Sequence, residues 1–230
     1  MTAHPANSYE VAALIDHTLL KPEATRAQVE RLCAEGLQHD FASVCVNSAF
    51  VAQVARLLRN SPVKTCVVVG FPLGANLSEV KVYEAQKALN QGAQEIDMVI
   101  NVGTLKAGDD ASVKHEIESL AAACHQHHAL LKVILETSLL NEYEKVRACK
   151  AARDARADFV KTSTGFGSAG ATVEDVALLR SVVGPEMGVK ASGGIRTLEA
   201  LLKMVEAGAT RIGTSNGLGI LQEAKAKFAG

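Results

Sequence analysis

The 230-residue sequence contains little aromatic material: no tryptophan, three tyrosines and six phenylalanines. Few side chains are therefore left for the stacking platforms that bind single-stranded nucleic acids. An excess of one charge is missing too, because 24 Lys and Arg are balanced by 25 Asp and Glu, which gives a net charge of −1. Nucleic acids and acidic membranes select a clustered basic surface. We therefore expect neither kind of partner.

Long apolar runs and paired cysteines are absent as well. No run of about 20 apolar residues, the length that spans a bilayer, occurs in the sequence. Residues 1–8 lack the charged-then-apolar layout of a secretion signal. The five cysteines are odd in number and form no CxxC pair, so reduced thiols are the simplest interpretation. We expect a cytoplasmic protein without a membrane partner.

Common catalytic and metal-binding motifs are also missing. The sequence has neither a GxSxG elbow nor a phosphate-binding P-loop. The histidine-rich stretch at 125–128 follows a predicted helix, but no carboxylate or cysteine is spaced around it as a metal ligand would be. We interpret that stretch as a solvated helix end and expect no metal or other cofactor.

The sequence does contain a regular alternation of strand and helix patterns after a short N-terminal helix that closes over 11–15. Apolar, strand-like runs occur at 16–18, 42–46, 64–70, 95–100, 130–135 and 210–213, and two more end at Lys161 and Lys190. Helical patterns follow them at 25–37, 49–58, 77–90, 109–125, 142–153, 172–182, 197–206 and 215–227.

Strict alternation of eight strands with eight helices predicts parallel strands joined by crossover helices. Several strands are apolar at nearly every residue, as expected when both faces of the sheet are covered. Eight units in this length fit a (β/α)₈ TIM barrel, formed as a single domain over 1–230. An open doubly wound sheet is less favoured because its first turn is usually Gly-rich. Here residues 18–22 contain no glycine.

Two similar stretches stand out near the C-terminus: DFVKTSTGFG at 158–167 and MGVKASGGIR at 187–196. In each, a mostly apolar run ends on a lysine and continues into a turn of small, hydroxyl and glycine residues. An unpaired buried cation is costly, so one such lysine would suggest an exposed strand end, whereas two suggest a functional pair. Both lysines lie at the carboxyl ends of neighbouring strands, where the active site of a barrel forms, and strand alternation allows both side chains to point inward.

Two adjacent amines suggest nucleophilic chemistry. A lysine nucleophile must be neutral, and moving the reference pKa of about 10.4 to about 7 requires roughly 4.6 kcal/mol. A second cation about 4 Å away supplies roughly 4 kcal/mol at an effective dielectric near 20. The neutral amine then attacks a carbonyl and forms a Schiff base, an electron sink for carbon–carbon bond cleavage or formation. The spacing leaves open which lysine attacks.

Such chemistry also needs a group that moves protons. Glu95 and Asp97 share one face of the fourth strand, and Lys132 lies on the next strand. Asp97 is therefore a candidate acid/base, with a structural ion pair to Lys132 as the alternative. Asp16 and Thr18 on the first strand are weaker candidates for the same network. Cys45 on the second strand is either a packed thiol or a residue at the barrel mouth.

Glycines gather in the loops after the last three strands. Phosphate sites in barrels form from such loops and a nearby helix N-terminus, where backbone N–H groups face the anion. The alternative is that the glycines only permit tight turns. We predict a phosphate cradle of Gly193, Gly194, Ser215 and Asn216, with Arg196 close by. We expect further substrate contacts from Thr18, Cys45, Lys132, Thr164, Gly165 and Gly213.

These residues resemble those of the deoxyribose-phosphate aldolase family. The resemblance runs from about residue 10 to the C-terminus. It is carried by DHT at 16–18, VCV at 44–46, GFPLG at 70–74, EIDMVIN at 95–101, KVILET at 132–137, VKTSTGF at 160–166 and VKASGGIR at 189–196.

The resemblance implies a class I aldolase that reversibly cleaves 2-deoxy-D-ribose 5-phosphate to D-glyceraldehyde 3-phosphate and acetaldehyde without a cofactor. It implies that Lys161 forms the Schiff base, that Lys190 tunes it and helps to transfer protons, and that Asp97 acts with a water. It also implies a homodimer. Some members carry a lysine after the Thr-Gly of the first motif, where this sequence has Phe166.

Two other functions remain open at this stage. Another Schiff-base barrel aldolase would act on a sugar phosphate or bisphosphate. A non-catalytic barrel would bind a phosphosugar without turnover and would form no covalent adduct.

Overall fold

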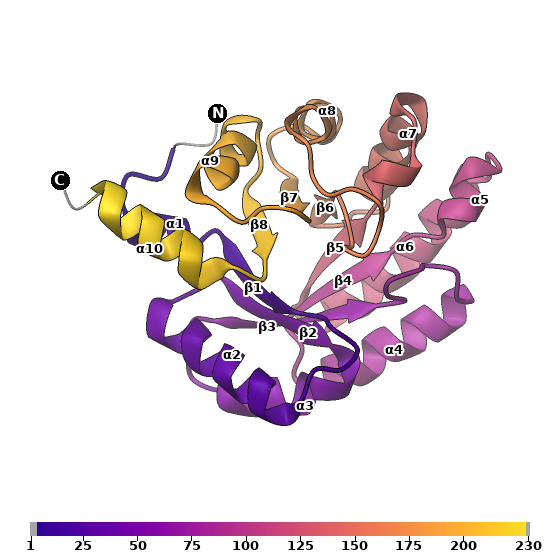
Figure 1. Ribbon diagram of the computed structural model, residues 1–230. Coiled ribbons are helices and arrows are strands. Elements are labelled where there is room, and N and C mark those ends of the chain that lie inside the picture. The colour runs from indigo at the N-terminus through magenta and orange to yellow at the C-terminus, as the bar shows by residue number, and fades with distance from the viewer. Residues whose placement is uncertain (1–3, 229–230) are drawn as a thin grey trace.

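The computed structural model describes residues 4–228, and its eight parallel strands close into a barrel in sequence order (Figure 1). The last strand pairs with the first through Asp16 and Gly213. The predicted (β/α)₈ barrel is therefore confirmed. The strands are β1 Ile15–Leu19, β2 Ser43–Asn47, β3 Lys64–Val69, β4 Glu95–Val99, β5 Leu130–Ile134, β6 Phe159–Lys161, β7 Gly188–Ser192 and β8 Arg211–Thr214.

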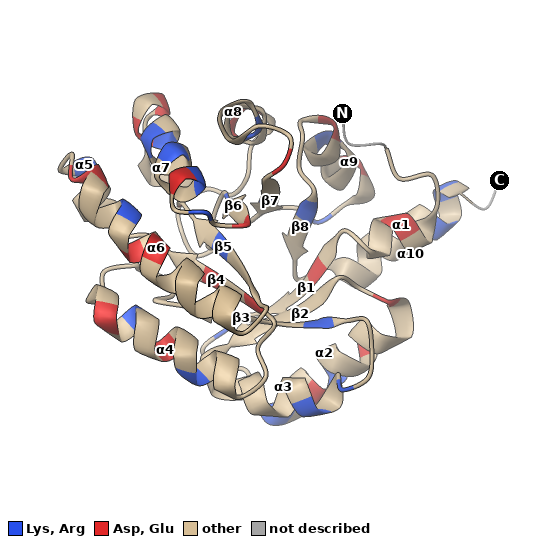
Figure 2. Ribbon diagram, turned by 180° about the vertical axis from the view of Figure 1, so that it is seen from behind, with Lys and Arg blue, Asp and Glu red and all other residues tan. Residues whose placement is uncertain are grey.

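Helices surround the barrel and cover the outer face of the strands (Figure 1). Where a helix carries both charge signs they are interspersed, as Figure 2 shows along α4 and α7. No described helix is long and apolar enough to cross a bilayer. The helices are α1 Ser8–Ala12, α2 Arg26–His39, α3 Val51–Leu57, α4 Ser78–Asn90, α5 Val102–Lys106, α6 Asp110–Gln126, α7 Glu142–Asp154, α8 Val173–Val183, α9 Leu198–Glu206 and α10 Gly217–Phe228.

The sequence prediction differs from the structure mainly at short helices. The N-terminal helix, expected to close over 11–15, spans Ser8–Ala12 and so ends earlier; Asn7 caps its start by accepting the Glu10 N–H at 2.9 Å. The helix α5 was not predicted, since it has only five residues and depends on a cap from Asn101. The predicted helix at 49–58 begins instead as a 3₁₀ turn, Ser48–Phe50, and a second 3₁₀ turn spans Thr137–Leu139.

The two faces of the strands have different chemistry. Outward residues such as Val67, Ile96 and Val133 are fully buried against the helices and belong to one large apolar core. Alternate residues of the same strands point into the barrel, and many of these are charged. The register places Asp97 beside Lys132 and Lys161 beside Lys190. The strand alternation therefore collects charges inside the barrel.

Candidate active site

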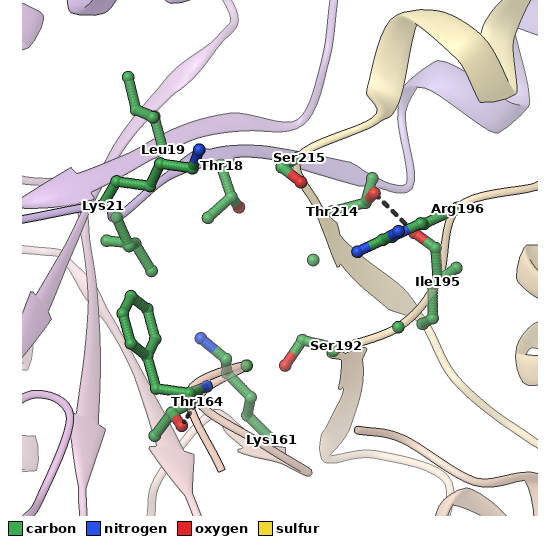
Figure 3. Close-up of a pocket in the computed structure, with 16 residues that line it drawn as sticks. Thr18, Leu19, Lys21, Lys161, Thr164, Ser192, Ile195, Arg196, Thr214 and Ser215 are labelled. Carbon is green, nitrogen blue, oxygen red and sulfur yellow. Dashed lines mark hydrogen bonds between the residues drawn. The ribbon is translucent and has the colours of Figure 1, made fainter. Parts of the chain in front are cut away.

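A cavity of about 360 Å³ opens at the carboxyl ends of β1, β6, β7 and β8 (Figure 3). Its wall consists of Lys161 and residues 18–21, 164–166, 192–196 and 213–215. Seven of the residues that we predicted to bind substrate or phosphate are part of this wall: Thr18, Thr164, Gly165, Gly193, Gly194, Gly213 and Ser215. Cys45, Lys132 and Asn216 lie outside it.

Asp97 is the centre of an ion-pair cluster directly below this cavity. Its Oδ2 atom accepts hydrogen bonds from Lys161 Nζ at 2.8 Å and from Lys190 Nζ at 2.7 Å. Its Oδ1 atom accepts one from Lys132 Nζ at 2.9 Å. The carboxylate therefore has two different sides. One oxygen joins the two lysines of the paired motifs, and the other contacts the lysine of β5.

A second tier of charges supports the lysines from the bottom of the barrel. Asp16 lies 2.5 Å from Lys190 Nζ and 2.7 Å from Arg211. Glu95 lies 2.5 Å from Lys132 Nζ and 3.1 Å from the same arginine. Arg211 was not identified from the sequence, although strand alternation places it on the inward face with Gly213. Arg211 meets its partners Asp16 and Glu95 because β8 pairs with β1 and closes the barrel.

The cluster contains one more cation than carboxylates. Lys132, Lys161, Lys190 and Arg211 carry four positive charges, and Asp16, Glu95 and Asp97 carry three negative ones. Among these seven groups, Lys161 alone lines the cavity. The charges balance when Lys161 is neutral, which is the state that a nucleophilic amine requires.

The surroundings fix the charge of the other members. Burial alone would raise the pKa of Asp97, but Lys132, Lys161 and Lys190 outweigh it and hold that pKa well below its ordinary value. Burial likewise opposes the charge on Lys190, yet Asp16 and Asp97 raise its pKa above the ordinary range. The pKa of Lys132 is also raised, because its carboxylate neighbours overcome desolvation. The sequence analysis considered only the effect of one amine on the pKa of the other and did not include the effect of these carboxylates on the lysine pKa values.

Glycines are required in the loops of the cavity wall. Gly165, Gly193 and Gly194 have φ values of 86°, 87° and 80°, a region that other residues rarely adopt. A Cβ atom on Gly193 would also lie 2.8 Å from the Cα of Gly170 in the neighbouring loop. Asn216 donates its amide hydrogen bond to the Arg196 carbonyl at 2.7 Å, so it joins two loops instead of facing the cavity.

Glu136 is a site residue that the sequence analysis missed. It is buried two residues after the end of β5 with a φ of 55°, and its carboxylate accepts hydrogen bonds from the backbone N–H and the hydroxyl of Thr164. A charged residue immediately after a buried strand was the available signal. Glu136 therefore ties the end of β5 to the loop that carries Gly165 and Phe166.

Cys45 is fully buried below the cavity, next to Cys66. The neighbouring Cys66 lowers the pKa of the Cys45 thiol, whereas burial raises that of Cys66. Two sets of three metal-ligand atoms lie close together here, Cys45–Cys66–Asp97 and Asp16–Cys66–Glu95. The carboxylates of both sets are already paired with lysine or arginine, the arrangement of an ion-pair network.

Comparison with known proteins places this geometry in a family. Residues 10–224 match the model of the DeoC/LacD family of aldolases. The chain is 55% identical over 212 residues to deoxyribose-phosphate aldolase 1 of Oceanobacillus iheyensis, covering 92% of this chain and 96% of that one. It is 56% identical over 218 residues to the deoxyribose-phosphate aldolase of Thermococcus gammatolerans, covering 94% and 97%.

Solved structures are similar over the same length. A putative deoxyribose-phosphate aldolase from Coccidioides immitis superposes with a TM-score of 0.93 at 41% identity, covering 97% of this chain and 88% of that one. The tetrameric deoxyribose phosphate aldolase of Aeropyrum pernix gives 0.91 at 35% identity, covering 97% and 94%. The family match, the identity and the shared barrel agree: this chain belongs to the DeoC/LacD family of aldolases.

Proposed function

We propose that this protein is a class I aldolase that reversibly cleaves 2-deoxy-D-ribose 5-phosphate to D-glyceraldehyde 3-phosphate and acetaldehyde. The observation that carries the proposal is the position of Lys161, whose amine lines the cavity 2.8 Å from Asp97 Oδ2. A Schiff-base enzyme needs an amine that reaches the substrate and a group nearby that moves protons. The names of the relatives support the same substrate.

Lys161 is the nucleophile in this mechanism. Its neutral amine adds to the aldehyde of the open-chain sugar, and loss of water gives an iminium ion. Electrons of the bond between the second and third sugar carbons then flow into the iminium, while the hydroxyl on the third carbon loses its proton and becomes the new aldehyde. Protonation of the remaining enamine and hydrolysis release acetaldehyde and free the amine for another cycle.

Asp97 and Lys190 serve the proton transfers. Asp97 stays ionised next to the charged Lys132 and Lys190, so it accepts a proton from the sugar hydroxyl through a water that bridges to the substrate. Lys190 stays charged and contacts the same oxygen of Asp97 at 2.7 Å. It thereby keeps positive charge next to the reacting amine. Lys132 contacts the other oxygen of Asp97 and holds the carboxylate in place.

The cavity wall suits an anionic substrate. Lys21, Lys161 and Arg196 line it, and no Asp or Glu is part of it in the described chain. Gly193 and Gly194 carry no side chain, which allows close approach of a phosphate to their N–H groups. The phosphate is therefore bound at the loops after β7 and β8, and the aldehyde end of the sugar reaches down to Lys161.

We also propose that the whole chain works as one barrel domain in a cytoplasmic homodimer. All five cysteines are buried and unpaired, as is typical of a reducing compartment. One solved relative is described as a tetramer, so association of copies occurs among relatives. Light scattering during gel filtration measures the number of subunits, and a monomer or a tetramer would contradict the proposed homodimer.

Reductive trapping tests the catalytic proposal. Incubation with acetaldehyde and borohydride should add one two-carbon unit per chain, and peptide mapping should place it on Lys161. Lys161→Ala should show no adduct, whereas Lys64→Ala, an exposed lysine at the start of β3, should be labelled like the wild type. An unchanged mass would favour a non-catalytic barrel, and a label on Lys190 would reverse the roles of the two lysines. Equal cleavage of a ketose bisphosphate would favour a different aldolase.

A further inference from the structure

Two cations of the cavity wall have no acidic partner. Lys21 and Arg196 are both exposed and line the same cavity as Lys161. Neither side chain forms an ion pair within residues 4–228, in contrast to the four cations of the buried cluster. Surface lysines and arginines often lack partners, but these two border a cavity whose wall contains no carboxylate. Their charges are available to a ligand.

The two side chains approach the cavity from different loops. Arg196 follows β7, in the same loop as Gly193 and Gly194, whereas Lys21 follows β1. Figure 3 shows them on opposite sides of the opening, with Lys161 and Ser192 toward the base of the view. A dianion held by the glycine loops would therefore have one cation on each side.

The backbone at Lys21 is well anchored. Leu20 is buried beside Cys45, and its carbonyl accepts a hydrogen bond from the Asn47 side chain at 3.1 Å. The Lys21 carbonyl accepts one from the Ala24 N–H, also at 3.1 Å. The lysine side chain thus extends from a fixed point over the opening. Its long apolar stem allows the ammonium group to follow a ligand while remaining near water.

Apart from the reacting amine of Lys161, the remaining wall supplies no cationic side chain. In the loop after β6, Phe166 packs edge-to-face on Phe71 with ring centroids 5.3 Å apart. An aromatic edge cannot neutralise a phosphate, so this side of the cavity is apolar. A phosphate monoester carries nearly two negative charges at neutral pH. Lys21 and Arg196 together match that charge.

Resting on the proposed aldolase function, we propose that Lys21 is a specificity-determining residue that binds the substrate phosphate from the wall opposite Arg196. Arg196 contributes a planar group that can bind two phosphate oxygens, and Lys21 contributes a mobile point charge. The lysine therefore favours phosphorylated over unphosphorylated sugars, and the apolar Phe166 wall makes the enzyme depend on it.

The test compares two substrates in matched variants. For the wild type, Lys21→Gln, Lys21→Arg and the control Lys64→Gln, kcat/KM is measured with 2-deoxyribose 5-phosphate and with 2-deoxyribose. Lys21→Gln should lower the ratio of the two values about tenfold, equivalent to about 1.4 kcal/mol. Lys21→Arg should restore most of the ratio. Lys64 is exposed at the opposite end of the barrel, so Lys64→Gln should leave it unchanged.

A binding measurement separates this proposal from the proposed activity. Inorganic phosphate is titrated into each variant by calorimetry, which requires no turnover. Weaker phosphate binding by Lys21→Gln than by Lys64→Gln supports the phosphate contact even if neither sugar is cleaved. Absence of cleavage would remove only the aldolase assignment. Equal phosphate affinity in all variants, or an unchanged substrate ratio in an active Lys21→Gln enzyme, overturns the role of Lys21.

Discussion

The protein buries lysine–carboxylate pairs in two regions, and they differ in how the charges are balanced. Outside the barrel, Lys81 of α4 and Glu116 of α6 form one pair at 2.8 Å. Lys81 Nζ also donates to the Val99 carbonyl at 2.8 Å, and Glu116 accepts from Ser78 and from the Asn101 N–H. One cation meets one anion, and every charged atom has a partner.

Inside the barrel, four cations meet three carboxylates, and the cluster reaches a cavity through Lys161. Both regions remove charge from water, so burial alone does not identify an active site. The excess charge and the access to a cavity distinguish the barrel cluster. The Lys81–Glu116 pair instead has a structural role. It joins α4 to α6, and the Lys81 side chain packs against Gly70 at the end of β3.

Lys161→Ala should have the largest effect on activity. Without the amine no Schiff base forms, and turnover should fall at least about 10⁴-fold, as expected for loss of a covalent nucleophile. The variant should stay folded, since the remaining three cations and three carboxylates balance. Retro-aldol rates and thermal unfolding measure the two effects. Residual turnover near the wild-type rate would show that the excess cation is not the nucleophile.

The two sides of Asp97 offer a second comparison. Lys190→Met removes a contact to the oxygen shared with Lys161, and Lys132→Met removes the contact to the other oxygen. Each should cost about 3–5 kcal/mol of stability, because Lys190→Met also breaks the buried pair with Asp16 and Lys132→Met also breaks the buried pair with Glu95. Lys190→Met should in addition lower kcat about 10²–10⁴-fold, the usual range for a proton-transfer group.

The readout for this pair is kcat per folded molecule, with the folded fraction taken from urea unfolding. Lys132→Met is the control, since it removes a lysine of equal burial from the same carboxylate. Equal losses of kcat in the two variants would contradict the assignment. They would mean that the contact of Lys132 to Oδ1 of Asp97 matters as much for catalysis as the contact of Lys190 to Oδ2.

The sequence sufficed for the barrel because its signals are local. Alternating apolar runs and helical periods identified all eight strands, usually within one or two residues. The five-residue α5 was missed because its cap at Asn101 is a side-chain contact that periodicity does not report. The proximity of Lys161 and Lys190 followed from strand alternation and neighbouring strands, and the register confirms that they are paired.

The rest of the site depends on closure and loops. Arg211 contacts Asp16 across 195 positions of sequence, which requires the pairing of β8 with β1. Lys21 and Glu136 lie just beyond strand ends, where side-chain direction is set by the loop and not by a strand period. Asn216 looked like a phosphate contact by position but is engaged by the Arg196 carbonyl. Local sequence patterns do not predict contacts between residues that only the folded loops and the closed barrel bring together.

Mutation of the Lys81–Glu116 pair, the framework pair, should lower stability and leave kcat nearly unchanged, whereas mutation of the barrel cluster should lower kcat. Glu116→Leu leaves Lys81 buried without its counter-ion and should cost about 3–5 kcal/mol of stability while kcat stays close to wild type. Lys81→Met combined with Glu116→Leu should recover much of the loss, because an apolar pair can replace a buried ion pair. Urea unfolding and retro-aldol rates provide the measurements. A large loss of kcat in a stable double variant would give this pair a catalytic role.

Alkaline pH should produce the smallest and most specific difference between the two regions. Burial lowers the pKa of Lys81 from 10.5, although Glu116 opposes the shift. The folded protein therefore binds fewer protons at Lys81 than the unfolded chain does, and this group makes stability rise as pH increases toward 10.5. Lys190 has the opposite sign: its raised pKa gives stability that is fully present below 10.5 and is lost only as pH rises through the higher folded value.

As pH rises toward 10.5, the stability of the wild type minus that of Lys81→Met should therefore increase, whereas Lys190 adds no slope below 10.5. Titrating groups that do not contact Lys81 are common to both proteins and cancel in the difference. Urea unfolding at several pH values measures it. A difference that stays constant or falls would mean that Glu116 outweighs desolvation at Lys81. The framework pair would then be electrostatically like the barrel cluster, and only the excess cation and the cavity would separate them.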